Sequence, residues 1–323
     1  MFEEGDIFHE QDEMEDGYAD ESITLGQEPS LFIDYGSLSG DIYVSVDGND
    51  DSGDGSQETP FATIQKAIVE AAIDAVIIVS AGDYPESLNF GGKEITVSTS
   101  QSATITPQEG TRGVIFNCGE TNNSVLKGFT ITGGNVGNKI GGGIYISKAS
   151  PSIEECTIMG NYARQGGGIA ILHGSAPTIN GCTINGNNSH ARGAGLLVID
   201  SNPTFMGEIW VTGNELMRTC PCMRNIEQTR GAGFFFQKAT PTFGGIVYVN
   251  GNTASEKVED YLTTGEFVLE NDALVIDGVL LPSYGGGVYV SKDSDSNITD
   301  GKFNFEGGNS ATSSGNEDFY REP

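Results

Sequence analysis

An acidic, glycine-rich loop near the start of the chain carries a pattern that suits calcium. In DGNDDSGDGSQE (47–58), oxygen-bearing side chains occupy positions 1, 3, 5 and 12 of a calcium-binding loop, namely Asp47, Asn49, Asp51 and Glu58. Position 6 is Ser52 instead of the glycine that the sharp turn requires, and the preceding IYVSV is typical of a strand, where such a loop follows a helix. Two interpretations stay open, a Ca2+ site and a solvated acidic loop.

A second set of residues suits the binding of anions. Four bases stand just before recurring glycine triplets, namely Lys139, Arg164, Arg192 and Arg230. The guanidinium fork matches a carboxylate, so bases spaced one repeat apart would bind an acidic polysaccharide or an acidic peptide. The alternative interpretation is a set of ordinary solvated turn residues.

The cysteines fall into two groups. Cys220 and Cys222 form a Cys-Pro-Cys sequence in a loop, and Cys-x-x-Cys redox chemistry needs another spacing. Two interpretations stay open, an intermolecular disulfide in an extracellular protein and a metal held by two thiolates. Cys156 and Cys182 alternate with interior positions, so we expect a buried stack of thiols rather than a disulfide. We expect Cys118 in the core as well.

The elements that position these residues come from an internal repeat. Its clear units start 25 to 27 residues apart, with longer gaps later: GGGIYISKASPSIEECTIMGN (141–161), GGGIAILHGSAPTINGCTINGN (166–187), GAGLLVIDSNPTFMGEIWVTGN (193–214), GAGFFFQKATPTFGGIVYVNGN (231–252) and GGGVYVSKDSDSNITDGKFNFEGGN (285–309). Each unit has three short segments of alternating apolar residues, which predicts three strands with one buried face. Such strands bury a core only when the units stack, so the pattern predicts a parallel β-helix.

Stacking brings equivalent positions of successive units into rows. Ile153, Ile179, Phe205 and Phe243 are predicted to form one interior row. A structural asparagine ladder is predicted from the residues that follow glycine just after a strand, namely Asn135, Asn161, Asn187, Asn214, Asn252 and Asn309.

These motifs resemble a known superfamily. The GGGI and TIxGN motifs are similar to the repeats of polymorphic outer-membrane and related surface proteins, and IYVSVDGNDDSGDGSQETPFATIQKAI (42–68) resembles the start of secreted members of the pectin-lyase-like superfamily. The resemblance covers roughly residues 41–310 and implies an all-β fold, a right-handed parallel β-helix solenoid with one N-terminal capping helix. It implies little about activity, because this fold carries many functions.

Enzymes of this superfamily need residues that are largely missing here. The resemblance implies that a lyase pairs Ca2+-binding carboxylates with a Lys or Arg base, and that a hydrolase uses paired aspartates with Gly-His-Gly and Arg-x-Lys motifs. Of the acids on the repeats, Glu154, Glu155, Asp200 and Glu208 do not stack into one cluster, and the hydrolase motifs are absent. His9, His173 and His190 are isolated, so no catalytic residue is predicted.

The chain divides into an acidic arm (1–40), a first strand with the acidic loop and a capping helix (41–75), the β-helix (76–310) and a polar tail (311–323). Apolar residues at helical spacing predict that PFATIQKAIVEAAIDA (60–75) forms the capping helix. Two insertions, 215–230 and 253–284, emerge along one edge, and the second is predicted to hold an added hairpin. Insertions on one face often mark a binding face.

Composition and charge narrow the functions. The 46 glycines exclude a helical bundle, and no apolar run of membrane-spanning length exists. A net charge of −29 excludes nucleic acid as a partner, while residues 121–252 have nine bases against six acids. We therefore expect a secreted or cell-surface structural protein that self-associates into a fibre, the arm of one subunit on the next. The alternative is a Ca2+-dependent polysaccharide lyase or a noncatalytic binder of acidic polysaccharide.

Overall fold

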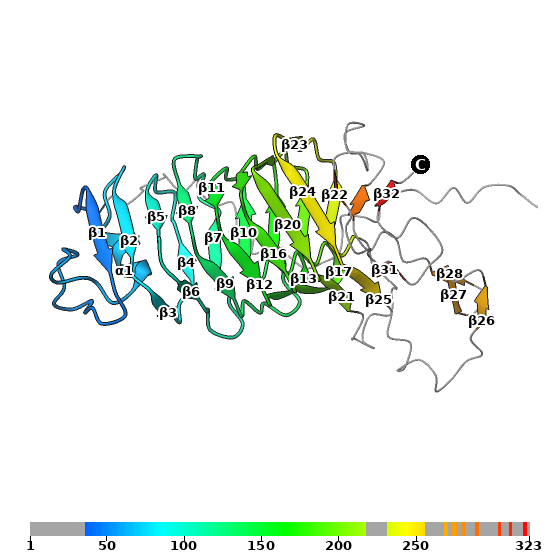
Figure 1. Cartoon of the computed structure of the whole chain (residues 1–323), viewed down its shortest axis with the longest axis horizontal. Helices are drawn as coiled ribbons and strands as arrows, with labels where there is room; N and C mark the ends of the chain where they lie inside the picture. The colour runs from blue at the N-terminus through cyan, green and yellow to red at the C-terminus, as the bar shows by residue number, and fades with distance from the viewer. Residues whose placement is uncertain are drawn as a thin grey trace, which may run out of the picture. The chain divides into compact units, whose positions relative to one another are not determined.

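Strands of successive coils stack in parallel in the computed structural model (Figure 1). The structure describes residues 36–217 and 231–255, with side chains up to Thr253, and beyond these the backbone of the strands β26 to β32. Four parallel sheets are formed, and one coil of the middle region contributes a strand to each. In the order in which such a coil meets them, we name them sheets 1 to 4.

The strands of each sheet are given in stacking order. Sheet 1 holds β4 (Leu88–Asn89), β7 (Val114–Phe116), β10 (Ile144–Ser147), β14 (Ile169–Leu172), β18 (Leu196–Ile199), β22 (Phe234–Gln237), β29 (Val288–Val290) and β32 (Phe319–Arg321). Sheet 2 holds β1 (Asp41–Val44), β2 (Val76–Val79), β5 (Thr96–Ser98), β8 (Val125–Lys127), β11 (Ser152–Glu154), β15 (Thr178–Asn180), β19 (Thr204–Met206) and β23 (Thr242–Phe243). Sheet 3 holds β3 (Gly82–Tyr84), β6 (Ala103–Ile105), β9 (Thr130–Thr132), β12 (Thr157–Met159), β16 (Thr183–Asn185), β20 (Glu208–Thr212), β24 (Ile246–Asn250) and β30 (Phe303–Asn304). Sheet 4 holds β13 (Tyr162–Gln165), β17 (Asn188–Arg192), β21 (Glu215–Met217), β25 (Thr253–Ser255) and β31 (Ser310–Ala311).

Sheet 4 corrects the prediction of three strands per unit. Its strands follow the asparagine turn, where segments such as NYARQ show no clean alternation, and β13 and β17 shift register between Ala163 and Gln165. The first residues of both insertions therefore belong to the solenoid, since β21 and β25 are strands of this sheet. The predicted hairpin in the second insertion is confirmed and gains a strand, because β26 (Val268–Glu270), β27 (Ala273–Ile276) and β28 (Val279–Leu281) pair antiparallel.

The interior is built from the rows that alternation predicts. Ile153 pairs in register with Ile179, Ile179 with Phe205, and Phe205 with Phe243. The first three are fully buried, and Phe243 packs against the same core from a partly exposed position. Burying these rows along the whole solenoid supplies the hydrophobic free energy that a single coil lacks.

The asparagine ladder is confirmed for four residues and corrected for one. Asn161, Asn187, Asn214 and Asn252 are fully buried, and each of the first three donates from Nδ2 to the Oδ1 of the next, at 2.8–3.0 Å. Asn135 lies outside the ladder, because the extra glycine in TITGGN puts Gly134 at the register position, where its N–H donates to Asn161 Oδ1 at 2.9 Å. Asn309 lies outside the described residues.

The third glycine of each triplet makes room for this ladder. A Cβ on Gly168 would lie 2.9 Å from Asn187 Nδ2 and 2.5 Å from the carbonyl oxygen of Gly195. The third glycine and the asparagine later in the same repeat unit therefore depend on each other, which explains why both recur in the repeat.

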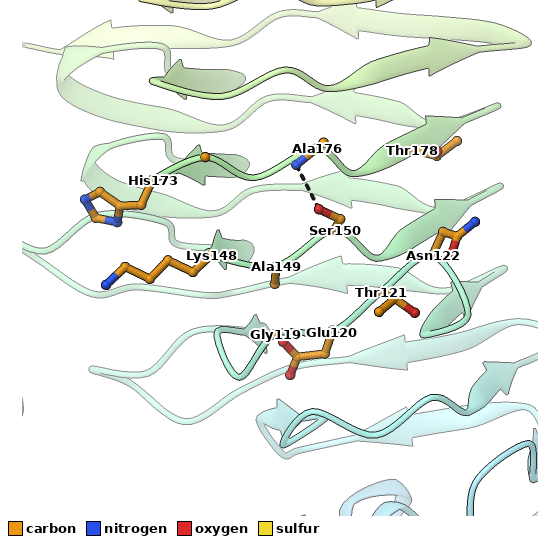
Figure 2. Close-up of a pocket in the computed structure, with 11 residues that line it drawn as sticks. Gly119, Glu120, Thr121, Asn122, Lys148, Ala149, Ser150, His173, Ala176 and Thr178 are labelled. Atoms are coloured by element: carbon orange, nitrogen blue, oxygen red, sulfur yellow. Dashed lines mark hydrogen bonds between the residues drawn. The ribbon is translucent and has the colours of Figure 1, made fainter. Parts of the chain in front are cut away.

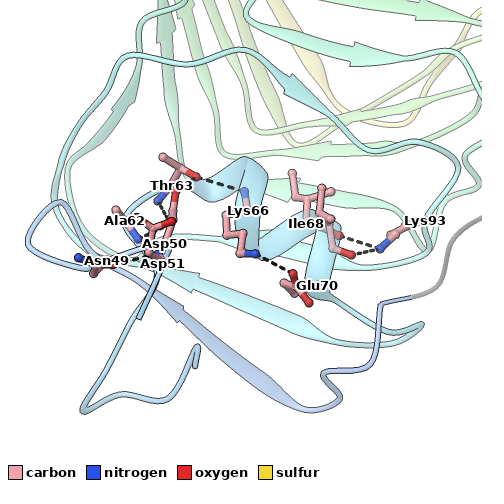
Figure 3. Close-up of polar contacts among 10 residues, drawn as sticks. Asn49, Asp50, Asp51, Ala62, Thr63, Lys66, Ile68, Glu70 and Lys93 are labelled. Atoms are coloured by element: carbon pink, nitrogen blue, oxygen red, sulfur yellow. Dashed lines mark hydrogen bonds and ion pairs between the residues drawn. The ribbon is translucent and has the colours of Figure 1, made fainter. Parts of the chain in front are cut away.

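The capping helix α1 (Ile64–Glu70) is shorter than the predicted 60–75 (Figure 3). The residues before it pair with the acidic loop instead, because Asp50 Oδ1 accepts the N–H groups of Ala62 and Thr63 at 2.7 and 3.0 Å. At the other end, the buried Lys93 donates from Nζ to the carbonyl oxygens of Ile68, Val69 and Ala71 at 2.9, 2.7 and 3.0 Å. Among the described residues no helix has the length and apolar composition needed to cross a membrane.

The structure confirms the predicted burial of two cysteines and corrects the predictions for Cys118 and for the end of the arm. Cys156 and Cys182 are buried and unbridged, as predicted, whereas Cys118 is exposed in a turn and not in the core. Cys220 and Cys222 lie outside the described residues, as does the arm up to residue 35. The end of the predicted arm is part of the solenoid, because the Leu38 N–H donates to the Glu70 carbonyl oxygen at 2.9 Å.

Candidate functional site

A groove of about 640 Å³ opens where the chain turns from sheet 1 into sheet 2 (Figure 2). Three successive coils line it with the segments 119–122, 148–150 and 173–178. Because the coils rise by about 4.8 Å each, equivalent side chains stand one above another along its wall. The groove therefore suits a ligand that extends along the solenoid.

One wall of the groove is formed by residues from a row whose backbone has the left-handed conformation. Lys148, His173, Asp200 and Lys238 each follow the end of a sheet 1 strand, with φ angles of 53°, 58°, 49° and 50°. Residues other than glycine rarely adopt this conformation, and it turns the chain sharply toward sheet 2. All four side chains are exposed, and Lys148 and His173 lie at the groove.

Hydrogen bonds hold the floor of the groove in place and occupy both carboxylate oxygens of its acidic residue, Glu120. Glu120 is 1% exposed, and its two carboxylate oxygens accept the N–H groups of Gly92 and Cys118, each at 2.9 Å. The carbonyl oxygen of Glu120 accepts the Ser150 N–H at 2.6 Å, and Ser150 Oγ accepts the Ala176 N–H at 3.0 Å. The floor is thereby tied across three coils.

The groove consequently presents cationic and neutral polar groups to solvent. The Lys148 ammonium is exposed, and His173 Nδ1 lies 2.8 Å from Ser147 Oγ. Thr121, Asn122 and Thr178 add hydroxyl and amide groups at the opposite side. In a chain of net charge −29, this local arrangement favours an anionic ligand with many hydroxyl groups.

The predicted basic row lies elsewhere and is staggered. Arg164 lies beside Lys139, whose carbonyl oxygen accepts the Arg164 N–H at 2.9 Å, but Arg192 is in register with Gln165. The Arg192 guanidinium lies 5.4 Å from the centroid of the Phe235 ring, over an apolar cluster on the outer face of sheet 1. Arg230 lies outside the described residues. Anion binding by this row stays a prediction.

The predicted calcium residues lie in a loop that is braced internally (Figure 3). Asn49 Oδ1 accepts the N–H groups of Asp51 and Ser52, each at 2.9 Å. Among the residues described, no group of three or more His, Cys, Asp or Glu side chains is placed to hold a metal ion, and Asp47, Asp51 and Glu58 are within that range. Calcium binding by the loop stays a prediction.

Stacking creates one ionic cluster that the linear sequence hid. Lys127 Nζ lies 3.1 Å from Glu155 Oε1 and 3.5 Å from Glu154 Oε2 on the outer side of sheet 2. The Glu155 carboxylate, and then Glu154, raise the pKa of Lys127 above its ordinary value. Aligning GFTITGGN with the later repeats would have found it, because the alignment puts Lys127 and Glu154 in the same row.

Two histidines that looked isolated in the sequence have partners. His190 is buried in β17, where its Nε2 meets the Tyr162 hydroxyl and its Nδ1 lies 2.8 Å from the Met217 carbonyl oxygen. His173 contacts Ser147, as described above. Both partners come from neighbouring coils, so only stacking brings them together.

Comparison with known proteins leaves the function open. Residues 46–119 match a family described as "Protein of unknown function (DUF1565)". No curated protein matches the chain. A solved structure, described as the crystal structure of pectate lyase Pel9A, is similar with a TM-score of 0.44 and 15% identity over 87% of this chain and 80% of that one. The strand pairing of the chain confirms the predicted all-β fold, a solenoid of parallel β-strands.

Proposed function

We propose that this protein binds an extended acidic polysaccharide, without cleaving it, in the groove between sheets 1 and 2. The observation that carries the proposal is the groove itself, a 640 Å³ hollow in which an exposed lysine and a histidine stand on successive coils. Uronate carboxylates along a glycan would pair with the Lys148 ammonium. The hydroxyl groups of the same glycan would form hydrogen bonds with Thr121, Asn122 and Thr178. Location outside the cell belongs to the same proposal, because such polymers are found there.

Binding is proposed in place of cleavage because of how the groove uses its ionisable groups. The carboxylate of Glu120 is committed to two backbone N–H groups. The exposed Lys148 side chain is free to reach a carboxylate on the ligand, which suits charge pairing. A polysaccharide lyase is the competing function, and its unsaturated products would be seen as ultraviolet absorbance in the same assay.

The test is the affinity of the full chain for polygalacturonate, measured by isothermal titration calorimetry with and without Ca2+. Lys148→Ala should weaken binding about tenfold, the loss expected for one charge-assisted contact, and added salt should weaken the parent protein. Lys66→Ala is the matched control, because it removes the same charge from the distant helix α1. Absent binding by the parent protein would refute the proposal, as would equal affinities of the two variants. Loss of binding in Arg164→Ala with Arg192→Ala alone would move the site to the staggered basic row.

Self-assembly through the arm stays a separate prediction. Residues 1–35 of the arm and residues 218–230 of the first insertion lie outside the described residues, and Leu38 marks where the solenoid begins. Deleting residues 1–35 keeps Leu38 and should abolish fibres in negative-stain electron microscopy. Fibres that persist in the truncated protein, or short rods from the full chain, would remove the idea.

A further inference from the structure

The one tryptophan of the chain stands on the outer face of sheet 3 and not in the core. Trp210 in β20 pairs in register with Tyr248 in β24, and their rings stack with centroids 4.0 Å apart at an interplanar angle of 11°. Both side chains are partly exposed. Ile246, two residues before Tyr248 on the same face, is 52% exposed. Aromatic and aliphatic side chains are thus left partly exposed next to one another on this face, which indicates a binding surface.

The aromatic pair ends a straight row of hydroxyl groups. Thr104, Thr130, Thr157 and Thr183 lie in register, strand by strand, up to Trp210. The second outward row of the sheet reads Thr132, Met159, Asn185, Thr212 and Asn250. None of these side chains is buried and none carries a charge, and the exposed Glu208, in register with Ile246, stands at their edge. We call the two rows, from Thr104 to Tyr248 and from Thr132 to Asn250, the neutral strip.

The chemistry of the neutral strip points to one class of ligand. Its hydroxyl and amide groups can donate and accept hydrogen bonds at intervals of about 4.8 Å, and the rings offer apolar contact beside them. A neutral polysaccharide matches both features, because the hydroxyl groups at the edges of its sugar rings can form hydrogen bonds and the C–H groups on their faces can pack on the aromatic rings. A second copy of the chain fits less well, since the strip has too little apolar area for the core of a stable protein interface.

We propose that the neutral strip binds an extended, uncharged polysaccharide of β-linked hexoses along the solenoid, with Trp210 and Tyr248 as its aromatic contacts. An extended chain suits a straight strip, whereas a coiled glucan would leave it after a few sugars. The site is independent of the groove, because sheet 2 separates the turn that forms the groove from sheet 3 along every coil. A protein with both sites would hold an acidic and a neutral polymer together.

The test uses the fluorescence of Trp210, which reports on this strip alone because it is the single tryptophan. Cellohexaose is titrated into the full chain, and binding of hydroxyethylcellulose is measured by affinity electrophoresis. A saturable change in Trp210 emission is expected with cellohexaose, and polygalacturonate should leave it unchanged. Lys148→Ala should not alter the response, so failure of the groove proposal is distinguishable from failure of this one.

Variants separate binding from structural damage. Tyr248→Ala should weaken cellohexaose binding about tenfold, and Thr183→Val about fivefold, the losses expected for one aromatic contact and one hydrogen bond. Thr204→Val is the matched control, because it removes the same hydroxyl from the outer row of sheet 2. No saturable response to either glucan would overturn the proposal, as would equal affinity in Thr183→Val and Thr204→Val. A dimer in light scattering that Tyr248→Ala dissociates would assign the strip to self-association instead.

Discussion

Replacing Lys93 by methionine tests how the N-terminal end of the solenoid is closed. Lys93 is 6% exposed and lies one coil beyond helix α1, against the C-terminal end of that helix. Its ammonium donates to three carbonyl oxygens, those of Ile68, Val69 and Ala71. These oxygens have few other donors because a helix leaves its last carbonyls unpaired. Methionine keeps most of the volume of lysine and removes every donor.

The magnitude follows from two opposing terms. Three hydrogen bonds from a charged donor contribute about 1.5–3 kcal/mol each, and the favourable position at a helix C-terminus adds to them. Burying the ammonium costs several kcal/mol, which the methionine avoids. We expect the difference to destabilise the protein by about 3 kcal/mol, because the orphaned carbonyls stay buried while the ammonium is lost.

The assay is guanidinium unfolding combined with hydrogen exchange of the segment 61–75. A lower midpoint and faster exchange of α1 are expected together, since a solenoid can open at one end while its distant coils stay folded. Lys66→Met is the control, because Lys66 has a half-exposed ion pair with Glu70 at 2.8 Å and a contact with the Phe61 ring at 5.8 Å, which stabilise the protein less than three buried hydrogen bonds. A Lys93→Met protein that loses no more stability than the control would refute the reasoning.

Three further predictions concern the ladder, the thiols and the acidic loop. Asn187→Ala should lower the free energy of unfolding by about 4 kcal/mol, because it leaves several buried groups without a hydrogen bond, including the Ile158 carbonyl oxygen. Asn135→Ala, outside the ladder, should lower it by less than about 1 kcal/mol. Equal losses of stability in denaturant unfolding would contradict this register. Ellman's reagent at pH 8 should modify the exposed Cys118 in the native protein and reach Cys156 only after unfolding, since burial raises the pKa of Cys156 to about 12; modification of both at similar rates would count against the buried stack. Hydrogen bonds from the Thr59 hydroxyl, and then from Ser56, lower the pKa of Asp54 from 3.8 to about 2. The ionised Asp54 therefore stabilises the loop above pH 3.8, and this contribution is lost as the pH falls through 2. Carboxyl chemical shifts should show the Asp54 pKa rising toward 3.8 in Thr59→Val, and an unchanged pKa would exclude the hydroxyl as the cause of the shift.

The fold and most interior rows could be predicted from the sequence, for a simple physical reason. Alternation of apolar residues assigns faces within a strand, and a nearly constant repeat length assigns neighbours between strands. Ile153, Ile179 and Phe205 therefore pair as predicted. The same rule failed where the repeat length changed, because one extra glycine moved Asn135 out of the ladder, and it missed sheet 4, whose segments do not alternate cleanly.

Local pattern also misjudged positions where tertiary contacts compete with it. Residues 60–75 have helical periodicity, but Asp50 takes the N–H groups before Ile64, and the chain after Glu70 soon joins sheet 2, so the helix keeps two turns. Cys118 was expected in the core, since cysteine is an apolar residue type, yet it lies in the exposed turn after β7.

The candidate sites depended on the tertiary structure more than the fold did. Sequence spacing alone determined that the chain is a stack of coils with interior rows of apolar residues, because period and residue type are local properties. Only the structure brought Lys148 and His173 to one groove, since left-handed turns in successive coils place them there. The structure also shows how side chains meet across coils, Lys127 with Glu155 and Trp210 with Tyr248. Neighbours in a solenoid are a whole coil apart in the chain, so these contacts follow from register and not from sequence proximity.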